Sequence, residues 1–344
     1  MITTASDSPG YMNNSPAENK PCSIKVTINP KLLAGITDYI TAANESYLNV
    51  VEKNFNLEAG KISPILKDFT SYFLNRIDFC VNFELRELDI NCAVDLIMKL
   101  IQKADIPNHF EEWTEYHKTS KRQKPCENSF YLKNACVNIN CYGKYSQLQK
   151  KYPDNPSLKD AVAVIRFEVQ IKYLKIYSVS QAMKSPDMSG FNLIHALLSD
   201  EFSQEMVTQY YYKTIRRGDY YTLKTAREKV KRFNFNVNKN DRLIEALELV
   251  NACRGIPKAQ ETLQGKELED FRRSLKDLET IGINPVTIPQ NWKIQHIPNL
   301  LDTYIEKIES ERSKKKLEQF RQEAFEEYVR DCKKYKKSWL HPVS

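Results

Sequence analysis

The sequence predicts an α+β fold in which an antiparallel sheet, with helices on one of its faces, is followed by a mainly helical C-terminal region. Three segments, residues 76–85, 137–144 and 161–173, alternate apolar and polar residues with the period of a half-buried strand. From residue 191 onward the apolar residues take helical spacing instead. Strands with one apolar side are expected to pack that side against helices.

The polar sides of these three strands carry residues that are able to do chemistry. Asp78 lies on the polar side of the first strand, Tyr142 and Lys144 on that of the second, and Arg166 and Glu168 on that of the third. If the strands are neighbours in one sheet, their polar sides form one open surface. We therefore expect carboxylates, a tyrosine and cations to converge there.

Shifts in composition along the chain predict four segments. Residues 1–21, rich in Ser, Asn and Pro, are expected to form a disordered leader, and residues 22–180 the α+β domain. That domain includes a helical stretch over 32–74, interrupted near Gly60 and Pro64. Residues 181–295 have short helical patterns and turn signals typical of a helix-turn-helix-like DNA-binding region. Residues 296–344 predict a long amphipathic helix and a tail.

Net charge, the length of apolar stretches and the cysteine pattern limit the partners and the cellular location to be expected. The 344 residues include 51 basic and 44 acidic side chains, a net charge of +7, which permits a polyanionic partner without establishing one. No stretch has the roughly 20 apolar residues that a membrane helix needs, so no membrane contact is expected. The 8 cysteines are scattered, with no metal-binding spacing. This pattern is typical of a reducing compartment and predicts a cytoplasmic location.

The polar strand sides suggest phosphoryl-transfer chemistry. Two carboxylates on adjacent strands, Asp78 and Glu168, suit a hard cation such as Mg²⁺ or Mn²⁺. A tyrosine beside that cation can attack phosphorus and form a covalent phosphotyrosine. Because a free phenol has a pKa of about 10, Tyr142 needs help, which the metal and Lys144 would provide by favouring the phenolate. Lys144 is alternatively expected to contact a phosphate.

The same residues also have simpler structural interpretations. Asp78 can pair with Arg76 or Arg166, and Glu168 can pair with the basic residues of its own strand. Tyr142 is one of 19 tyrosines, and tyrosine is common in strands. Pattern alone favours these structural roles, whereas the gathering of all these residues on polar strand sides favours a site.

Short segments in a fixed order carry a family resemblance. They are Arg76–Asp78, Asn140–Tyr145 and Ile165–Lys175, preceded by a strand-like segment at Cys22–Pro30. Together they resemble the rolling-circle replication initiators of phages and plasmids, a family that includes the gene II protein of filamentous phages. The resemblance covers residues 22–178 well and the C-terminal half loosely. It is carried by order and spacing, since no single segment is specific.

The resemblance implies a nuclease core that nicks one strand of a supercoiled or single-stranded origin. In the family, the tyrosine of a Tyr-x-Lys motif attacks the phosphodiester, which assigns that role to Tyr142 with Lys144 as its companion. Asp78 and Glu168 match the acidic positions that hold Mg²⁺ or Mn²⁺. Nicking leaves a 5′-phosphotyrosine and a 3′-OH that primes a host polymerase, and a host helicase is a further expected partner. Tyr145 is the alternative nucleophile.

Basic residues near aromatic ones predict DNA contacts through phosphate pairing and base stacking. Solvated loops and core tyrosines explain the same pattern equally well. The candidate DNA-binding residues are Lys121, Arg122, Lys124, Arg166, Arg216 and Arg217.

Three alternative functions remain open at this point. One is a mobilisation relaxase with the same chemistry, and another is a non-catalytic DNA-binding protein that controls replication. The third is a metal-dependent nuclease that needs Asp78 and Glu168 but forms no covalent intermediate through Tyr142.

Overall fold

The structure is a computed structural model that describes residues 2–3, 24–88, 90, 93–117, 122–125, 129–183, 193–233 and 235–338. Only the backbone is described for residues 2–3, 114–117, 122–125 and parts of the last helix. The expected leader lies outside the described residues except for β1 (Ile2–Thr3). The chain forms two compact units, Met1–Glu84 with His109–Tyr210, and Leu85–Asn108 with Tyr211–Ser344. This division falls after Tyr210, whereas the sequence predicted a boundary near residue 180.

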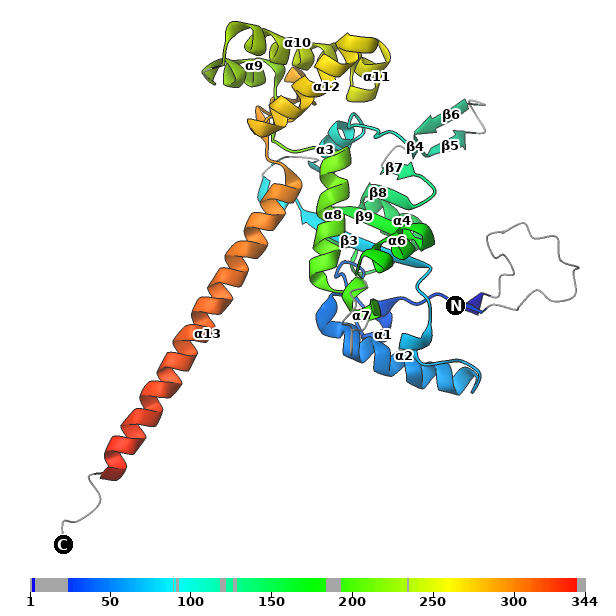
Figure 1. The fold of residues 1–344 in the computed structure, drawn as a ribbon, viewed down its shortest axis with the longest axis vertical. Helices are drawn as coiled ribbons and strands as arrows, with labels where there is room; N and C mark the ends of the chain where they lie inside the picture. Colours follow the sequence, from blue (N-terminus) through cyan, green and yellow to red (C-terminus); the bar gives the residue numbers. More distant parts are fainter. Residues whose placement is uncertain are drawn as a thin grey trace, which may run out of the picture. The chain divides into compact units, whose positions relative to one another are not determined.

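The first unit is built on a five-stranded antiparallel sheet with the strand order β3-β9-β8-β7-β4 (Figure 1). The three strands predicted from alternation are β3 (Arg76–Glu84), β8 (Val137–Gly143) and β9 (Val164–Lys172), and β9 lies between the other two. β7 (Ser129–Lys133) and β4 (Glu111–Glu112) complete the sheet. The prediction of helices combined with an antiparallel sheet is confirmed.

The alternating pattern gives this sheet one apolar face. Ile77, Phe79, Val81 and Phe83 of β3 are buried on that face, as is every second residue of β9 from Ile165 to Ile171. Helix α8 (Asp200–Thr214) lies along the sheet (Figure 1) and brings Phe202 against Phe79, with 5.6 Å between ring centroids. This packing explains why the first unit extends to Tyr210.

The expected helical stretch over residues 32–74 is divided into several pieces. They are α1 (Pro30–Leu33), η1 (Glu45–Tyr47), α2 (Leu48–Ile62) and η2 (Phe69–Ser71). α2 ends before Pro64, near the predicted break. The chain also leaves helical geometry between α1 and η1, because the Asp38 carboxylate accepts hydrogen bonds from the backbone N–H groups of Ile40 and Thr41. A small core containing Leu48, Phe55, Ala59, Phe69 and Ile194 holds these pieces together.

Shorter elements complete the first unit. The strands are β2 (Lys25–Val26), which pairs with β1, and the hairpin of β5 (Thr114–His117) with β6 (Arg122–Pro125). The helices are α4 (Lys144–Lys151), α5 (Leu158–Ala161), α6 (Tyr173–Met183) and α7 (Leu193–Leu197).

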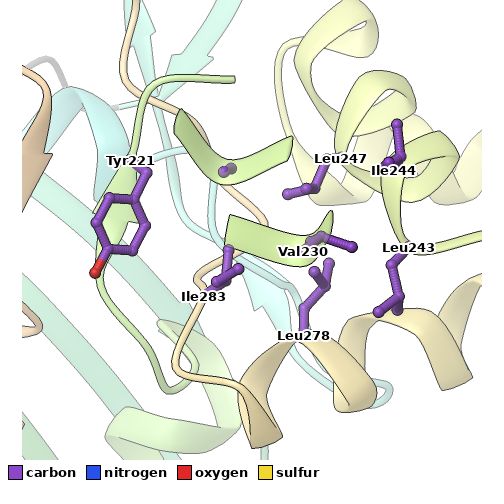
Figure 2. Packing of buried hydrophobic residues seen from close by; sticks show 8 residues of the cluster. Tyr221, Val230, Leu243, Ile244, Leu247, Leu278 and Ile283 are labelled. Atoms are coloured by element: carbon purple, nitrogen blue, oxygen red, sulfur yellow. The ribbon is translucent and has the colours of Figure 1, made fainter. Parts of the chain in front are cut away.

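The second unit is mainly helical, as the sequence predicted for this part of the chain. Its elements are η3 (Arg86–Leu88), α3 (Ala93–Ile101), β10 (Tyr220–Tyr221), α9 (Leu223–Arg232), α10 (Val237–Cys253), α11 (Ile256–Glu261), α12 (Gly265–Thr280), η4 (Gln290–Trp292), β11 (His296–Ile297) and α13 (Leu300–Ser338). Figure 2 shows the core that α9, α10 and α12 share, with Val230, Leu243, Leu247 and Leu278 buried together. That these helices bind DNA stays a prediction.

Local sequence signals fix where the helices of this unit begin. The side chains of Thr222 and Asn236 accept hydrogen bonds from backbone N–H groups in the first turns of α9 and α10.

A close approach of two backbone segments requires glycine before β10. Gly218 has φ +86°, and a Cβ atom there would lie 2.6 Å from the backbone nitrogen of Ile283. Only glycine fits this close approach.

Neither a membrane-spanning helix nor a disulfide bond is found among the described residues. No helix within the described ranges combines the length and the apolar character that a membrane span requires. The described cysteines Cys80, Cys136, Cys141 and Cys253 are free thiols.

Candidate active site

The polar face of the sheet is the side of β3, β9, β8 and β7 that faces away from α8. Strand register arranges its residues in three parallel rows. In strand order from β3 to β7, the rows are Asn82, Arg166, Tyr142 and Ser129; Cys80, Glu168, Asn140 and Tyr131; and Asp78, Gln170, Asn138 and Lys133. The strands therefore place the predicted carboxylates and the predicted tyrosine on one face of one sheet.

Tyr142 and Glu168 are in direct contact on this face. The Tyr142 hydroxyl donates a hydrogen bond to Glu168 Oε1 at 2.6 Å. Burial, followed by the negative charge and the hydrogen bond of Glu168, raises the pKa of Tyr142. The phenol is thus held in its neutral form, with its proton directed at the carboxylate. The sequence prediction gave Glu168 a metal and missed this role as a hydrogen-bond acceptor.

Lys144 lies beside the same phenol, but in a helix. The strand ends at Gly143 and Lys144 is the first residue of α4, so its expected place on the strand is wrong. Its side chain still reaches the site, with Nζ 5.8 Å from the centroid of the Tyr142 ring and 2.9 Å from Gln147 Oε1, to which it donates a hydrogen bond. Burial, aided by the positive charge of Arg166, lowers the pKa of Lys144 to about 8.

Asp78 is set apart from this pair. Arg76 donates two hydrogen bonds to its carboxylate, from Nε to Oδ1 at 2.6 Å and from Nη2 to Oδ2 at 2.5 Å. Its row is also one step removed from the row of Glu168. Among the described residues, no group of three or more His, Cys, Asp or Glu side chains is placed to hold a metal ion. The structure thus gives Asp78 the ion pair with Arg76 that the simpler interpretation expected.

Arg166, a candidate DNA contact, belongs to a hydrogen-bond network over the polar face. Its Nε donates to Asn82 Oδ1 at 2.7 Å and its Nη2 donates to the carbonyl oxygen of Ile40 at 2.6 Å. Asn82 Nδ2 donates to the same carbonyl at 2.6 Å. The guanidinium is also 4.0 Å from Glu168 Oε1. The Ile40 carbonyl is therefore bound to Asn82 and Arg166, two residues of the row that contains Tyr142.

Arg216 and Arg217, the candidate DNA contacts of the second unit, have different surroundings. The Arg216 guanidinium pairs with Asp105 at 2.9 Å and with Glu279 at 2.7 Å, and its side chain is only 11% exposed. Arg217 is exposed, and its guanidinium lies 3.8 Å from the centroid of the Tyr212 ring. Arg217 is thus accessible to solvent and its contact with DNA stays a prediction, whereas Arg216 is held in ion pairs within the second unit.

The remaining basic candidates are described in part or not at all. Lys121 lies outside the described residues. Arg122 and Lys124 belong to β6, where their backbones pair with His117 and Glu115, and their side chains are not described. Their contact with DNA stays a prediction.

Two buried oxygen atoms on the polar face bear on the expected cation. Asn138 Oδ1 and Asn140 Oδ1 have no hydrogen-bond partner among the described protein atoms. Asn140 is also the cross-strand partner of Glu168 in β9. Carboxylate and amide oxygens are the ligands that hard divalent cations prefer. The donor chemistry around Glu168 therefore fits Mg²⁺ or Mn²⁺.

Comparison of the chain with models of protein families, with curated proteins and with solved structures gave no match. The resemblance of residues 22–178 to the rolling-circle initiators therefore stays a prediction from the order and spacing of short segments. The family roles of Tyr142, Lys144, Asp78 and Glu168 stay predictions.

Proposed function

We propose that this chain is a DNA-nicking enzyme that initiates rolling-circle replication, with Tyr142 as its nucleophile. The observation that carries this proposal is the 2.6 Å hydrogen bond from the Tyr142 hydroxyl to Glu168 on the polar face of the sheet. A nucleophilic hydroxyl is activated by a base within hydrogen-bond reach, and Glu168 meets that requirement. Lys144 supplies a cation beside the same ring.

The proposed reaction follows from these contacts. The Tyr142 oxygen attacks the phosphorus of one phosphodiester while its proton passes to the Glu168 carboxylate. The bond between phosphorus and the 3′ oxygen breaks, and that oxygen leaves with the bonding electrons and takes a proton from the Lys144 ammonium. The products are a 5′-phosphotyrosine and a free 3′-OH that primes a host polymerase. Attack by a 3′-OH on the phosphotyrosine reverses these steps and rejoins the strand.

A cation and further partners belong to the same proposal. Mg²⁺ or Mn²⁺ bound beside Glu168 would neutralise charge on the phosphoryl oxygens. Arg166 holds positive charge 4.0 Å from Glu168. The substrate would be a supercoiled or single-stranded phage or plasmid origin, with a host helicase as partner and the cytoplasm as location.

A second candidate function, a non-catalytic DNA-binding protein that controls replication, is favoured by the burial of Tyr142. The residue is only 7% exposed, and its row neighbour Arg166 is hydrogen-bonded to the Ile40 carbonyl. A phosphodiester can reach a phenol this buried only if neighbouring groups move. In the non-catalytic protein, the bond from Tyr142 to Glu168 would simply stabilise the sheet.

A nicking assay tests the proposal against these alternatives. The full chain is incubated with Mg²⁺ or Mn²⁺ and supercoiled DNA that carries the sequences flanking its own coding region, and the products are separated on denaturing gels. We expect a protein-linked 5′ end that Tyr142→Phe abolishes and that the control Tyr145→Phe retains. Glu168→Gln should slow nicking by about 100-fold or more, the contribution typical of a general base, while mobility-shift affinity for DNA is unchanged.

Each other result assigns a different function. An adduct that survives in Tyr142→Phe but not in Tyr145→Phe would make Tyr145 the nucleophile. Nicking with no adduct would indicate a metal-dependent nuclease. DNA binding without any nicking by the wild-type chain would support the non-catalytic protein.

A further inference from the structure

We infer that Asn140 and Asn138 supply oxygen ligands to a divalent cation beside Glu168, in the place that the sequence gave to Asp78. The use of that cation in nicking rests on the proposed function, whereas its binding does not. The site would take a hard cation such as Mg²⁺ or Mn²⁺, because all of its ligands are oxygen atoms.

The first observation is that two polar atoms are buried without a partner. Asn138 Oδ1 and Asn140 Oδ1 have no hydrogen-bond partner among the described residues, although almost no solvent reaches them. Buried polar atoms nearly always have a partner, and an unpaired one is costly to bury. Both oxygens belong to one strand, β8, and both face the polar side of the sheet. A cation bound by both would satisfy them together.

The second observation is the place of these oxygens relative to Glu168. Asn140 is the direct cross-strand partner of Glu168, and opposed side chains on one face have Cβ atoms about 4.5–5.5 Å apart. Asn138 lies two residues before Asn140 in β8, on the same face of the sheet. Its Nδ2 donates a hydrogen bond to Gln170 Oε1 at 3.2 Å. With the amides placed as in the structure, this bond uses the nitrogen of Asn138 and leaves its oxygen without a donor.

The state of the carboxylates favours the same assignment. Both oxygens of Asp78 accept hydrogen bonds from Arg76, so this carboxylate already has a cationic partner. At Glu168, the hydrogen bond from Tyr142 and the contact with Arg166 both involve Oε1. A carboxylate has a second oxygen that can bind a cation while the first accepts the phenol proton. Glu168 can therefore serve the cation and Tyr142 at once.

Binding of Mn²⁺ to the full chain without DNA tests the inference. Free Mn²⁺ is followed by electron paramagnetic resonance, for wild type and for Asn140→Ala, Asn138→Ala, Glu168→Gln and Asp78→Asn. We expect Asn140→Ala and Glu168→Gln to weaken Mn²⁺ binding by about tenfold or more, and Asn138→Ala to weaken it by about threefold or more. Asp78→Asn, the matched control, should stay within about twofold of wild type. Asn140→Asp should bind Mn²⁺ more tightly, because it adds a negative charge.

Thermal unfolding separates loss of a ligand from loss of the fold. Asn140→Ala removes an oxygen that has no partner, so the variant should unfold without Mn²⁺ at a temperature no lower than wild type. Mn²⁺ should raise the unfolding temperature of the wild type, and at the same Mn²⁺ concentration this rise should be clearly smaller in Asn140→Ala.

Three results would overturn the inference: no Mn²⁺ binding by the wild type, wild-type affinity in Asn140→Ala, or dependence of binding on Asp78 in place of Asn140. The test is independent of the nicking proposal. If Mn²⁺ binding depends on Asn140 but the DNA stays intact, the cation site stands and the nicking proposal fails. If Tyr142 nicks DNA and Asn140→Ala binds Mn²⁺ like the wild type, the nicking proposal stands and this inference fails.

Discussion

The buried amino group of Lys144 makes stability depend on pH, and Lys144→Met measures the effect. Only 4% of the residue is exposed, and burial lowers the pKa of its side chain from 10.5 to about 8. At about 1.4 kcal/mol per pH unit, that difference corresponds to about 3 kcal/mol. This is an upper bound on the free energy by which the buried ammonium destabilises the folded state at pH 7.

The sign of the pH dependence follows from the lowered pKa. Below pH 8 the amine is protonated in both states, so the folded state carries the whole cost of burying the charge. Between about pH 8 and 10.5 the unfolded chain holds a proton that the folded chain has lost, and the stability of the wild type rises with pH. Lys144→Met has no such group and no such rise.

Urea denaturation of both proteins at several pH values measures this difference. At pH 7 the variant should be more stable than wild type by up to about 3 kcal/mol, and by pH 9.5 the advantage should shrink by about 2 kcal/mol. Lys150→Met, at an exposed position of the same helix, is the control, and its difference from wild type should not vary with pH. A constant difference between Lys144→Met and wild type from pH 7 to 9.5 would refute the reasoning.

Three further substitutions, two of them with a matched control variant, test other parts of the structure by urea or thermal unfolding. Tyr142→Phe removes the donor to a half-buried carboxylate and should lower the free energy of unfolding by about 1–3 kcal/mol. Gly218→Ala forces a Cβ atom against backbone at positive φ and should cost about 2 kcal/mol or more, whereas Gly35→Ala, at φ +79° with open space around it, should cost about 1 kcal/mol. Arg216→Met removes the cation that Asp105 and Glu279 share and should cost about 3–5 kcal/mol, while Arg217→Met should stay within about 0.5 kcal/mol of wild type.

Different results would contradict each of these expectations. Unchanged stability in Tyr142→Phe would mean that Glu168 is satisfied without the phenol. Equal costs for the two glycine substitutions would argue against the close approach to Ile283. A fully stable Arg216→Met would return that arginine to the set of DNA-contact candidates.

Alternation along the strands accounts for most of what the sequence could predict about the site. Period-two spacing fixes which side chains share a face, so it placed Tyr142 and Glu168 on the polar side before any pairing was known. It also placed Asn138 and Asn140 there. Alternation does not show which hydrogen bonds a side chain makes. That the Oδ1 atoms of Asn138 and Asn140 lack a hydrogen-bond partner, and so could bind a cation, can be learned only from the structure.

Contacts between distant segments account for what the sequence could not predict. The row that a residue occupies depends on strand register, so Asp78 and Glu168 were expected together although they lie in different rows. The hydrogen bonds of Arg166 and Asn82 to Ile40 join segments more than 40 residues apart. The burial of Arg216 between Asp105 and Glu279 likewise depends on tertiary packing, which a local pattern of basic and aromatic residues does not contain.

The residue that becomes attached to DNA tests the central claim most directly. After nicking, the DNA of the protein–DNA adduct is trimmed with a nuclease and the protein is digested with a protease. The nucleotide-bearing peptide is then sequenced by tandem mass spectrometry. We expect a nucleotide linked through phosphate to Tyr142. Attachment to Tyr145 or to any other residue, or cleaved DNA with no attached peptide, would contradict it.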